Sequence, residues 1–243
     1  MKAWKILFAA IISITGTAFA ADIDQELNQE QATQTATSIT IIFDTSGSMA
    51  ENNKIGQAKN AFSKWLASLP EEYNLCLIDF VKGQARLAVP LGDGNRDQAL
   101  AHVGKVRPYG KTPVCECLKI AQTQIDQRRA EHSPYERHVV VVFTDGKETV
   151  DRRGDAGVAD EIRKLRSSTI EVVGIGFHGE GDYMKPIATT YYHAGDEKEL
   201  VAGLSKVDAE IGDDSDVEIT PSDLKLIAGT DIPTPAAPSP DKK

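Results

Sequence analysis

Short apolar runs alternate with longer amphipathic segments along most of the 243-residue chain. The short runs are rich in Val, Ile and Phe and predict β-strands at 39–43, 75–80, 139–144 and 171–177. The longer segments repeat apolar residues at helical spacing and predict α-helices at 54–69, 95–106, 114–129, 155–166 and 198–211. Phe62 and Trp65 fall on the apolar stripe of the first helix, so we expect both in the core.

The strand-length runs also indicate the type of sheet. Residues 139–143 read Val-Val-Val-Val-Phe, and a strand that is apolar on both faces must be covered on both faces. The alternation of such strands with helices predicts an α/β fold of the Rossmann-like type, a doubly wound, mostly parallel sheet with helices on both faces. Residues 85–90 follow a turn at Lys82-Gly83 and have polar flanks, which predicts one antiparallel edge strand.

The first twenty residues have the pattern of an export signal. Lys2 and Lys5 precede an apolar run at 6–14, and Ala-Phe-Ala at 18–20 supplies the small residues of a cleavage site. We therefore expect 1–20 to be a signal peptide that is removed, and the product to be periplasmic or secreted. The apolar run is shorter than the roughly 20 residues of a membrane span, so we expect no membrane span.

Composition divides the rest of the chain into three parts. Residues 21–37 are rich in Gln, Glu, Asn and Thr, which predicts a flexible leader. The periodic segments belong to one domain at 38–211. From 212 to 243 the chain is acidic and proline-rich, which predicts an extended tail.

The charge balance argues against polyanionic partners. Acidic side chains number 36 against 27 basic ones, for a net charge of −9, and removal of the two signal-peptide lysines takes it to −11. Nucleic-acid binding needs a dense basic face, for which the sequence gives no sign. We therefore expect no nucleic-acid partner.

Three cysteines in an exported chain allow at most one internal disulfide. Cys117 falls on the face of its predicted helix that points toward the sheet, whereas Cys115 shares a side with Lys119 and Gln122. Cys76 lies on a predicted strand and is the more plausible mate for Cys117, because helices of this architecture pack directly on the sheet. Three reduced thiols remain the alternative, since small buried cysteines pack well without bonding.

Oxygen-bearing side chains follow two of the predicted strands. Asp44, Ser46 and Ser48 come directly after the first strand, and Asp145 ends the strand at 139–144. Ligands of open parallel sheets gather beyond the carboxyl ends of the strands, where two carboxylates would repel each other unless a cation lay between them. Hard oxygen donors favour Mg²⁺, with Mn²⁺ or Ca²⁺ possible, over zinc or copper.

Three short motifs resemble the von Willebrand factor A domain. Residues 44–48 read Asp-Thr-Ser-Gly-Ser and are similar to the Asp-x-Ser-x-Ser signature of that family. Residues 110–113, Gly-Lys-Thr-Pro, resemble the loop that carries its metal-binding threonine, and 144–146, Thr-Asp-Gly, resemble its later aspartate at a strand end. The resemblance extends over roughly 38–211.

This resemblance implies a metal-ion-dependent adhesion site, and we expect no catalysis because the motifs place no nucleophile–base pair beside the metal. It implies that Ser46, Ser48 and Thr112 are direct or switchable metal ligands, while Asp44 and Asp145 act largely through water. In that family an acidic side chain of a partner completes the coordination. We therefore expect an exported, non-enzymatic interaction module that binds a partner protein presenting Asp or Glu to the metal.

Other functions fit the same motifs less well. Residues 104–112 resemble a phosphate-binding loop, but five residues separate the glycines where the motif needs four, so we expect no nucleotide. A metal-dependent hydrolase is a weaker alternative, because Ser46 stands where an aspartyl-phosphate enzyme needs a second acid. A regulatory or scaffolding subunit of an envelope enzyme or pilus-type assembly, acting through other surfaces, remains open.

Among the remaining charged residues, one acid and three lysines are expected to have no role in binding or catalysis. Asp79 lies inside an apolar strand and is expected to be a satisfied structural acid. Lys54, Lys59 and Lys64 are expected to lie on the solvated face of the first helix.

Overall fold

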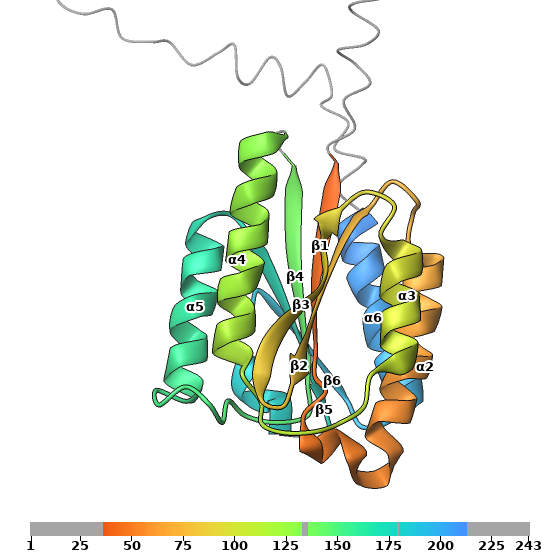
Figure 1. The fold of residues 1–243 in the computed structure, drawn as a ribbon, viewed down its shortest axis with the longest axis vertical. Helices are drawn as coiled ribbons and strands as arrows, with labels where there is room; N and C mark the ends of the chain where they lie inside the picture. The colour runs from red at the N-terminus through yellow and green to blue at the C-terminus, as the bar shows by residue number, and fades with distance from the viewer. Residues whose placement is uncertain (1–35, 133–135, 179, 213–243) are drawn as a thin grey trace, which may run out of the picture. The chain divides into compact units, whose positions relative to one another are not determined.

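The computed structural model describes residues 36–132, 136–178 and 180–212 (Figure 1). The predicted signal peptide, the leader as far as residue 35 and the tail from 213 onward lie outside the described residues. The chain divides into two units, 1–208 and 209–243, and each is considered by itself.

Within the described residues, six strands form one sheet in the order β3-β2-β1-β4-β5-β6. Their bounds are β1 Thr37–Phe43, β2 Asn74–Val81, β3 Gln84–Gly92, β4 Arg137–Thr144, β5 Glu171–Phe177 and β6 Thr190–Ala194. All neighbouring strands are parallel except β2 and β3. The predicted doubly wound, mostly parallel sheet with one antiparallel edge strand is therefore confirmed.

Helices cover both faces of the sheet (Figure 1). On one face lie α4 (Val114–Glu131) and α5 (Asp155–Ser167); on the other lie α2 (Lys54–Ser68), α3 (Arg96–Lys105) and the first twelve residues of α6 (Glu197–Gly212). Each of these helices begins and ends within two residues of its predicted bounds. Two 3₁₀ helices, η1 (Gly47–Asn53) and η2 (Glu180–Met184), have no counterpart in the sequence-based prediction. None of the described helices is both long and apolar enough to cross a bilayer.

The strand alternation divides the core between the two faces. Ile42 and Val142 belong to a buried cluster with Leu118 of α4 and Ile162 of α5. On the opposite face, the ring of Phe43 lies 4.9 Å from that of Phe62 in α2, and Trp65 packs edge-on against Phe62. Phe62 and Trp65 are thus both in the core, as predicted. The sheet lies between two layers of helices, and each of its faces packs against one layer.

All three cysteines are buried free thiols, so the predicted Cys76–Cys117 disulfide is not formed. Cys76 and Cys117 do share one core cluster, as the helix facing predicted. Cys115 is only 2% exposed, which contradicts its predicted position on the polar side of the helix. The reason is that α5 packs against this flank of α4: a side chain added at Gly157 would begin 3.1 Å from the Cys115 sulfur.

The edge of the sheet where the parallel strands begin is held by one buried carboxylate. Glu136 accepts hydrogen bonds from Ser38, from Asn74 Nδ2 at 2.6 Å and from Arg128 Nε at 2.9 Å. Burial alone would raise the pKa of Glu136, but these hydrogen bonds outweigh it and the pKa is lowered. Glu136 therefore joins the starts of β1 and β2 to the last turns of α4.

A buried histidine next to this network gives the fold a pH dependence. His138 is 1% exposed, and neither ring nitrogen has a hydrogen-bond partner among the described residues. Burial, and next the positive charge of Arg129, lower the pKa of His138 to about 4. The unfolded chain then binds a proton at a higher pH than the folded chain does, so stability falls as the pH is lowered from about 6.5 to 4.

We expect a His138→Leu variant to lose this acid sensitivity. Relative to wild type it should gain about 1 to 2 kcal/mol between pH 7 and pH 4.5, after allowance for solvent screening. Urea unfolding of both proteins across this range measures the gain. A stability difference that stays constant with pH would show that His138 does not titrate during unfolding.

Candidate metal site

The connections of the sheet diverge between β1 and β4, since β2 and β3 extend it on one side and β5 and β6 on the other. Such a switch point leaves a crevice at the carboxyl ends of the two strands, where ligands of open α/β sheets bind. β1 ends at Phe43 and β4 ends at Thr144, so Asp44 and Asp145 both lie at this point. The backbone N–H of Asp44 donates to the Phe143 carbonyl at 3.1 Å and keeps the two strand ends together.

A tight loop after β1 turns two serine hydroxyls toward the same point. Asp44 Oδ1 accepts a hydrogen bond from the backbone N–H of Ser46 at 2.7 Å, which holds the turn. The loop then enters η1 at Gly47, and the hydroxyl oxygens of Ser46 and Ser48 lie 3.0 Å apart. Alternating side chains of one short segment thus converge, as the spacing predicted.

Hydroxyl groups connect the two aspartates across the crevice. Ser48 Oγ donates to Asp145 Oδ1 at 2.7 Å, and Thr144 Oγ1 donates to Asp44 Oδ2 at 2.5 Å. Four of the five predicted site residues, Asp44, Ser46, Ser48 and Asp145, are therefore joined by hydrogen bonds in one cluster.

The fifth predicted residue, Thr112, lies in a loop that is bound to the first loop through the backbone. Gly47 N donates to the Gly110 carbonyl at 2.9 Å, and Tyr109 N donates to the Thr45 carbonyl at 2.8 Å. Thr112 is 5% exposed, and its described hydrogen bonds are made by its backbone with Thr149. The structure thus holds the loop that carries Thr112 against the loop after β1, but no described hydrogen bond joins Thr112 itself to the cluster.

Gly110 is required by the path of this third loop. Its φ of +92° lies in the region that favours glycine. A Cβ atom at this position would approach the backbone nitrogen of Gly83 to 2.6 Å. The loop that carries Thr112 can therefore cross the β2–β3 turn only with glycine at this point.

The two aspartates place negative charge in a buried space. Asp44 is fully buried and Asp145 is 2% exposed. Burial, and next the charge of Asp145, raise the pKa of Asp44 from 3.8 to about 6, although hydrogen bonds from Ser46 and Thr144 offset part of the rise. A cation in the crevice would stabilise both carboxylates in their charged form.

Lys54 is a member of this site that the sequence-based prediction missed. Its ammonium group donates to Asp145 Oδ2 at 2.7 Å, and its side chain is only 11% exposed. The predicted solvated position of Lys54 is therefore wrong. Lys54 is the first residue of α2, and helical side chains lean toward the amino-terminal end of their helix, so this one reaches Asp145 at the end of β4. Its position directly after the oxygen-rich loop was the available signal.

The donors present fit a small, hard divalent cation. They comprise two carboxylates and the hydroxyl groups of serine and threonine, which favour Mg²⁺ or Mn²⁺, and Ca²⁺ usually takes more carboxylate oxygens. No cluster of three or more His, Cys, Asp or Glu side chains able to hold a metal occurs in the described part of the chain. A cation here would therefore depend on the hydroxyl groups as well as the two acids.

Asp79 has the structural role that was expected of it. It is 1% exposed and accepts hydrogen bonds from Arg86 Nε at 2.8 Å and Arg86 Nη2 at 2.5 Å. His102 Nε2 lies 2.8 Å from the same carboxylate. The charge of Asp79 is thus satisfied within the strand pair β2–β3 and the neighbouring helix α3.

Comparison with known folds places these loops in context. The vWF domain of the type V pili tip protein Mfa5 from Porphyromonas gingivalis has a TM-score of 0.63 at 10% identity, covering 74% of this chain and 96% of that one. The manganese-loaded TRAP protein of Plasmodium vivax has a TM-score of 0.54 at 21% identity, with 70% and 72% covered. These similarities establish the fold.

The pilus adhesin SpaC from Lactobacillus rhamnosus GG is also similar, with a TM-score of 0.58 at 17% identity. The match covers 72% of this chain but only 30% of SpaC, so the chain spans about a third of that adhesin's length. No curated protein matches the chain in sequence.

The sequence model of the von Willebrand factor type A domain matches residues 38–202. The match spans more than half of the chain and includes all three loops that meet at the switch point between β1 and β4. The chain therefore belongs to the von Willebrand factor type A domain family.

Proposed function

We propose that this chain is an exported protein-interaction module that binds an acidic side chain of a partner protein through a divalent cation. The residues that would hold the cation are those of a complete metal-ion-dependent adhesion site, Asp44, Ser46, Ser48, Thr112 and Asp145. Mg²⁺ is the proposed ion, with Mn²⁺ as the nearest substitute. The bound ion would supply an open coordination position for the partner's carboxylate.

One observation carries this proposal: two buried aspartates follow neighbouring strands at the switch point and are connected by hydroxyl groups rather than separated by apolar side chains. Isolated buried carboxylates are strongly destabilising unless their charge is balanced. Lys54 balances one carboxylate oxygen of Asp145, while Asp44 has neutral hydrogen-bond donors. Ser46, Ser48 and Thr112 are the proposed direct ligands, and Asp44 and Asp145 are proposed to act through water.

The similar proteins support an adhesion-like role. Two of them are named as a pilus adhesin and a pilus tip protein, and a third was solved with manganese. The export signal proposed at 1–20 agrees with an extracellular or periplasmic place of action. We also propose that the chain is not an enzyme, because the carboxylates that accept hydrogen bonds from the hydroxyl groups of the site, Asp44 and Asp145, are the residues proposed to hold the cation rather than to take up a proton.

Calorimetric titration with Mg²⁺ and Mn²⁺ tests the site. Wild type should bind one ion and show a higher melting temperature at saturation, because the ion binds the folded chain only. Asp44→Asn should abolish both effects, since it removes a charge while keeping the size of the side chain. Asp160→Asn on the exposed surface of α5 is the matched control and should bind like wild type. Unchanged ion binding by Asp44→Asn would overturn the assignment.

Capture of a partner protein from solution distinguishes metal-dependent binding from a scaffolding role through other surfaces. A partner retained by wild type in Mg²⁺ should be lost with chelator and with Asp44→Asn, because both remove the ion. Capture that survives both treatments would instead favour a regulatory or scaffolding role through other surfaces.

A further inference from the structure

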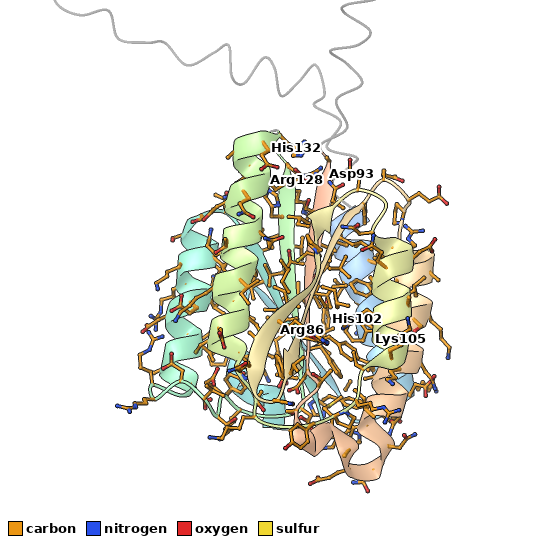
Figure 2. The ribbon with its side chains drawn as sticks, in the orientation of Figure 1. Arg86, Asp93, His102, Lys105, Arg128 and His132 are labelled. Atoms are coloured by element: carbon orange, nitrogen blue, oxygen red, sulfur yellow. The ribbon has the colours of Figure 1, made fainter. Side chains whose placement is uncertain are left out.

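A cavity of about 300 Å³ opens where β2 ends and β3 begins, beside the candidate metal site. We call it the basic cavity, because four cationic side chains line it: Lys82, Arg86, Lys105 and Arg107. Figure 2 shows two of them, Arg86 from β3 and Lys105 from α3, near His102. In a chain with a net charge of −9, such a concentration of positive charge is unexpected.

The positive charge of the cavity is not neutralised from within. Asp79 is the acidic residue of the lining, and its carboxylate is already bonded to Arg86 and His102. Lys82, Lys105 and Arg107 are exposed, and among the described residues none of the three has an ion pair with an acid. The cavity therefore presents three cationic groups that remain available to an anion from outside the chain.

The cavity and the metal site share one loop. Thr45 directly follows Asp44 and lines the cavity, and its Oγ1 donates to the Phe80 carbonyl at 2.9 Å. Tyr109, also in the lining, donates its backbone N–H to the Thr45 carbonyl. The metal site lies at the ends of β1 and β4, whereas the cavity lies at β2 and β3. Two strand spacings separate them, which is roughly 10 Å.

We propose that the basic cavity is an anion-binding subsite that takes a second carboxylate from an acidic polypeptide segment whose first carboxylate lies at the metal site. This inference rests on the proposed function and specifies its partner. An extended peptide advances about 3.3 Å per residue, so acids three residues apart would span the roughly 10 Å between the two sites. Tyr109 is 66% exposed at the cavity and offers an aromatic surface to the peptide itself, which a small inorganic anion would not use.

Two fluorescent peptides that differ in one residue test the inference. One carries the sequence Glu-Ser-Gly-Glu within a Gly/Ser peptide, and the other carries Glu-Ser-Gly-Gln. In Mg²⁺, wild type should bind the diacidic peptide about three- to tenfold more tightly, and added salt should reduce the difference. Fluorescence anisotropy measures both affinities.

A double variant, Lys105→Gln with Arg107→Gln, should remove this preference while leaving the binding of the monoacidic peptide unchanged. Arg163→Gln with Lys198→Gln removes the same charge from exposed positions outside the cavity and should keep the preference. The inference is overturned if wild type does not distinguish the peptides, or if the cavity variant binds the diacidic peptide as wild type does.

Repeating the peptide titrations with a chelator in place of Mg²⁺ distinguishes a failure of this inference from a failure of the proposed function. If binding persists without metal but the cavity variant still loses the preference for the diacidic peptide, the cavity is an anion site and the metal bridge is wrong. If the chelator abolishes binding while the cavity variant behaves like wild type, the metal bridge stands and the cavity inference is wrong.

Discussion

A Lys54→Met variant is expected to lose about 3 kcal/mol of stability in the presence of a chelator, because it leaves Asp145 buried without a cationic partner. Saturating Mg²⁺ should restore most of this loss, since a cation bound in the crevice would balance the same carboxylate. Methionine keeps the length and apolar stem of lysine, so the change is confined to the charge and its hydrogen bond to Asp145. Urea unfolding of wild type and variant, with chelator and with Mg²⁺, measures both effects.

Lys64→Met is the control for this experiment. Lys64 lies on the same helix and pairs with Glu197 at 3.2 Å, but its side chain is 67% exposed. Exposed ion pairs contribute less than about 1 kcal/mol, so this variant should be nearly as stable as wild type in both conditions. An equal loss of stability for Lys54→Met with and without Mg²⁺ would mean that Lys54 and the metal do not balance the same charge.

A Glu136→Gln variant is expected to lose about 3 kcal/mol at neutral pH, because it replaces a buried carboxylate with an amide whose N–H₂ group faces other donors. Ser38, Asn74 and Arg128 all donate to Glu136, and an amide can accept at only one of its two ends. The loss should shrink as the pH falls below about 4.5, since a carboxylate with a lowered pKa stabilises the fold only while it is charged.

Equilibrium unfolding at pH 7 and pH 3.5 measures this difference. Glu171→Gln serves as the control, because Glu171 pairs with Arg137 at 3.0 Å in a more exposed position and should contribute little at either pH. A Glu136→Gln variant as stable as wild type at pH 7 would show that Glu136 does not hold the strand starts together.

The sequence predicted the central strands well because burial on both faces leaves a continuous apolar run. β6 is different: no apolar run marks Thr190–Ala194, and most of its residues are only partly buried. It lies at the edge of the sheet, where one neighbour and partial covering permit Thr, Tyr and His. Of the two edge strands, the sequence pattern therefore predicted only β3, because a turn containing glycine joins it to β2.

At the candidate site, too, sequence pattern predicted some positions correctly and others wrongly. Asp44, Ser46, Ser48 and Asp145 follow strands directly, so the strand ends fix their positions, and the structure places them together. Lys54 and Cys115 were misplaced because helical periodicity describes which way a residue faces but not what lies beyond that face. The carboxylate of Asp145 lies beside Lys54, and α5 lies beside Cys115.

The three buried thiols provide a native reporter of local opening. Burial raises the pKa of Cys76 and of Cys115 to about 12, and that of Cys117 well above its usual value, so the reactive thiolate is scarce in the folded chain. Cys76 is covered by α4, which also carries the other two cysteines. The rate at which a thiol reagent modifies Cys76 or Cys117 in the unaltered protein therefore measures how often α4 separates from the sheet, without any engineered label.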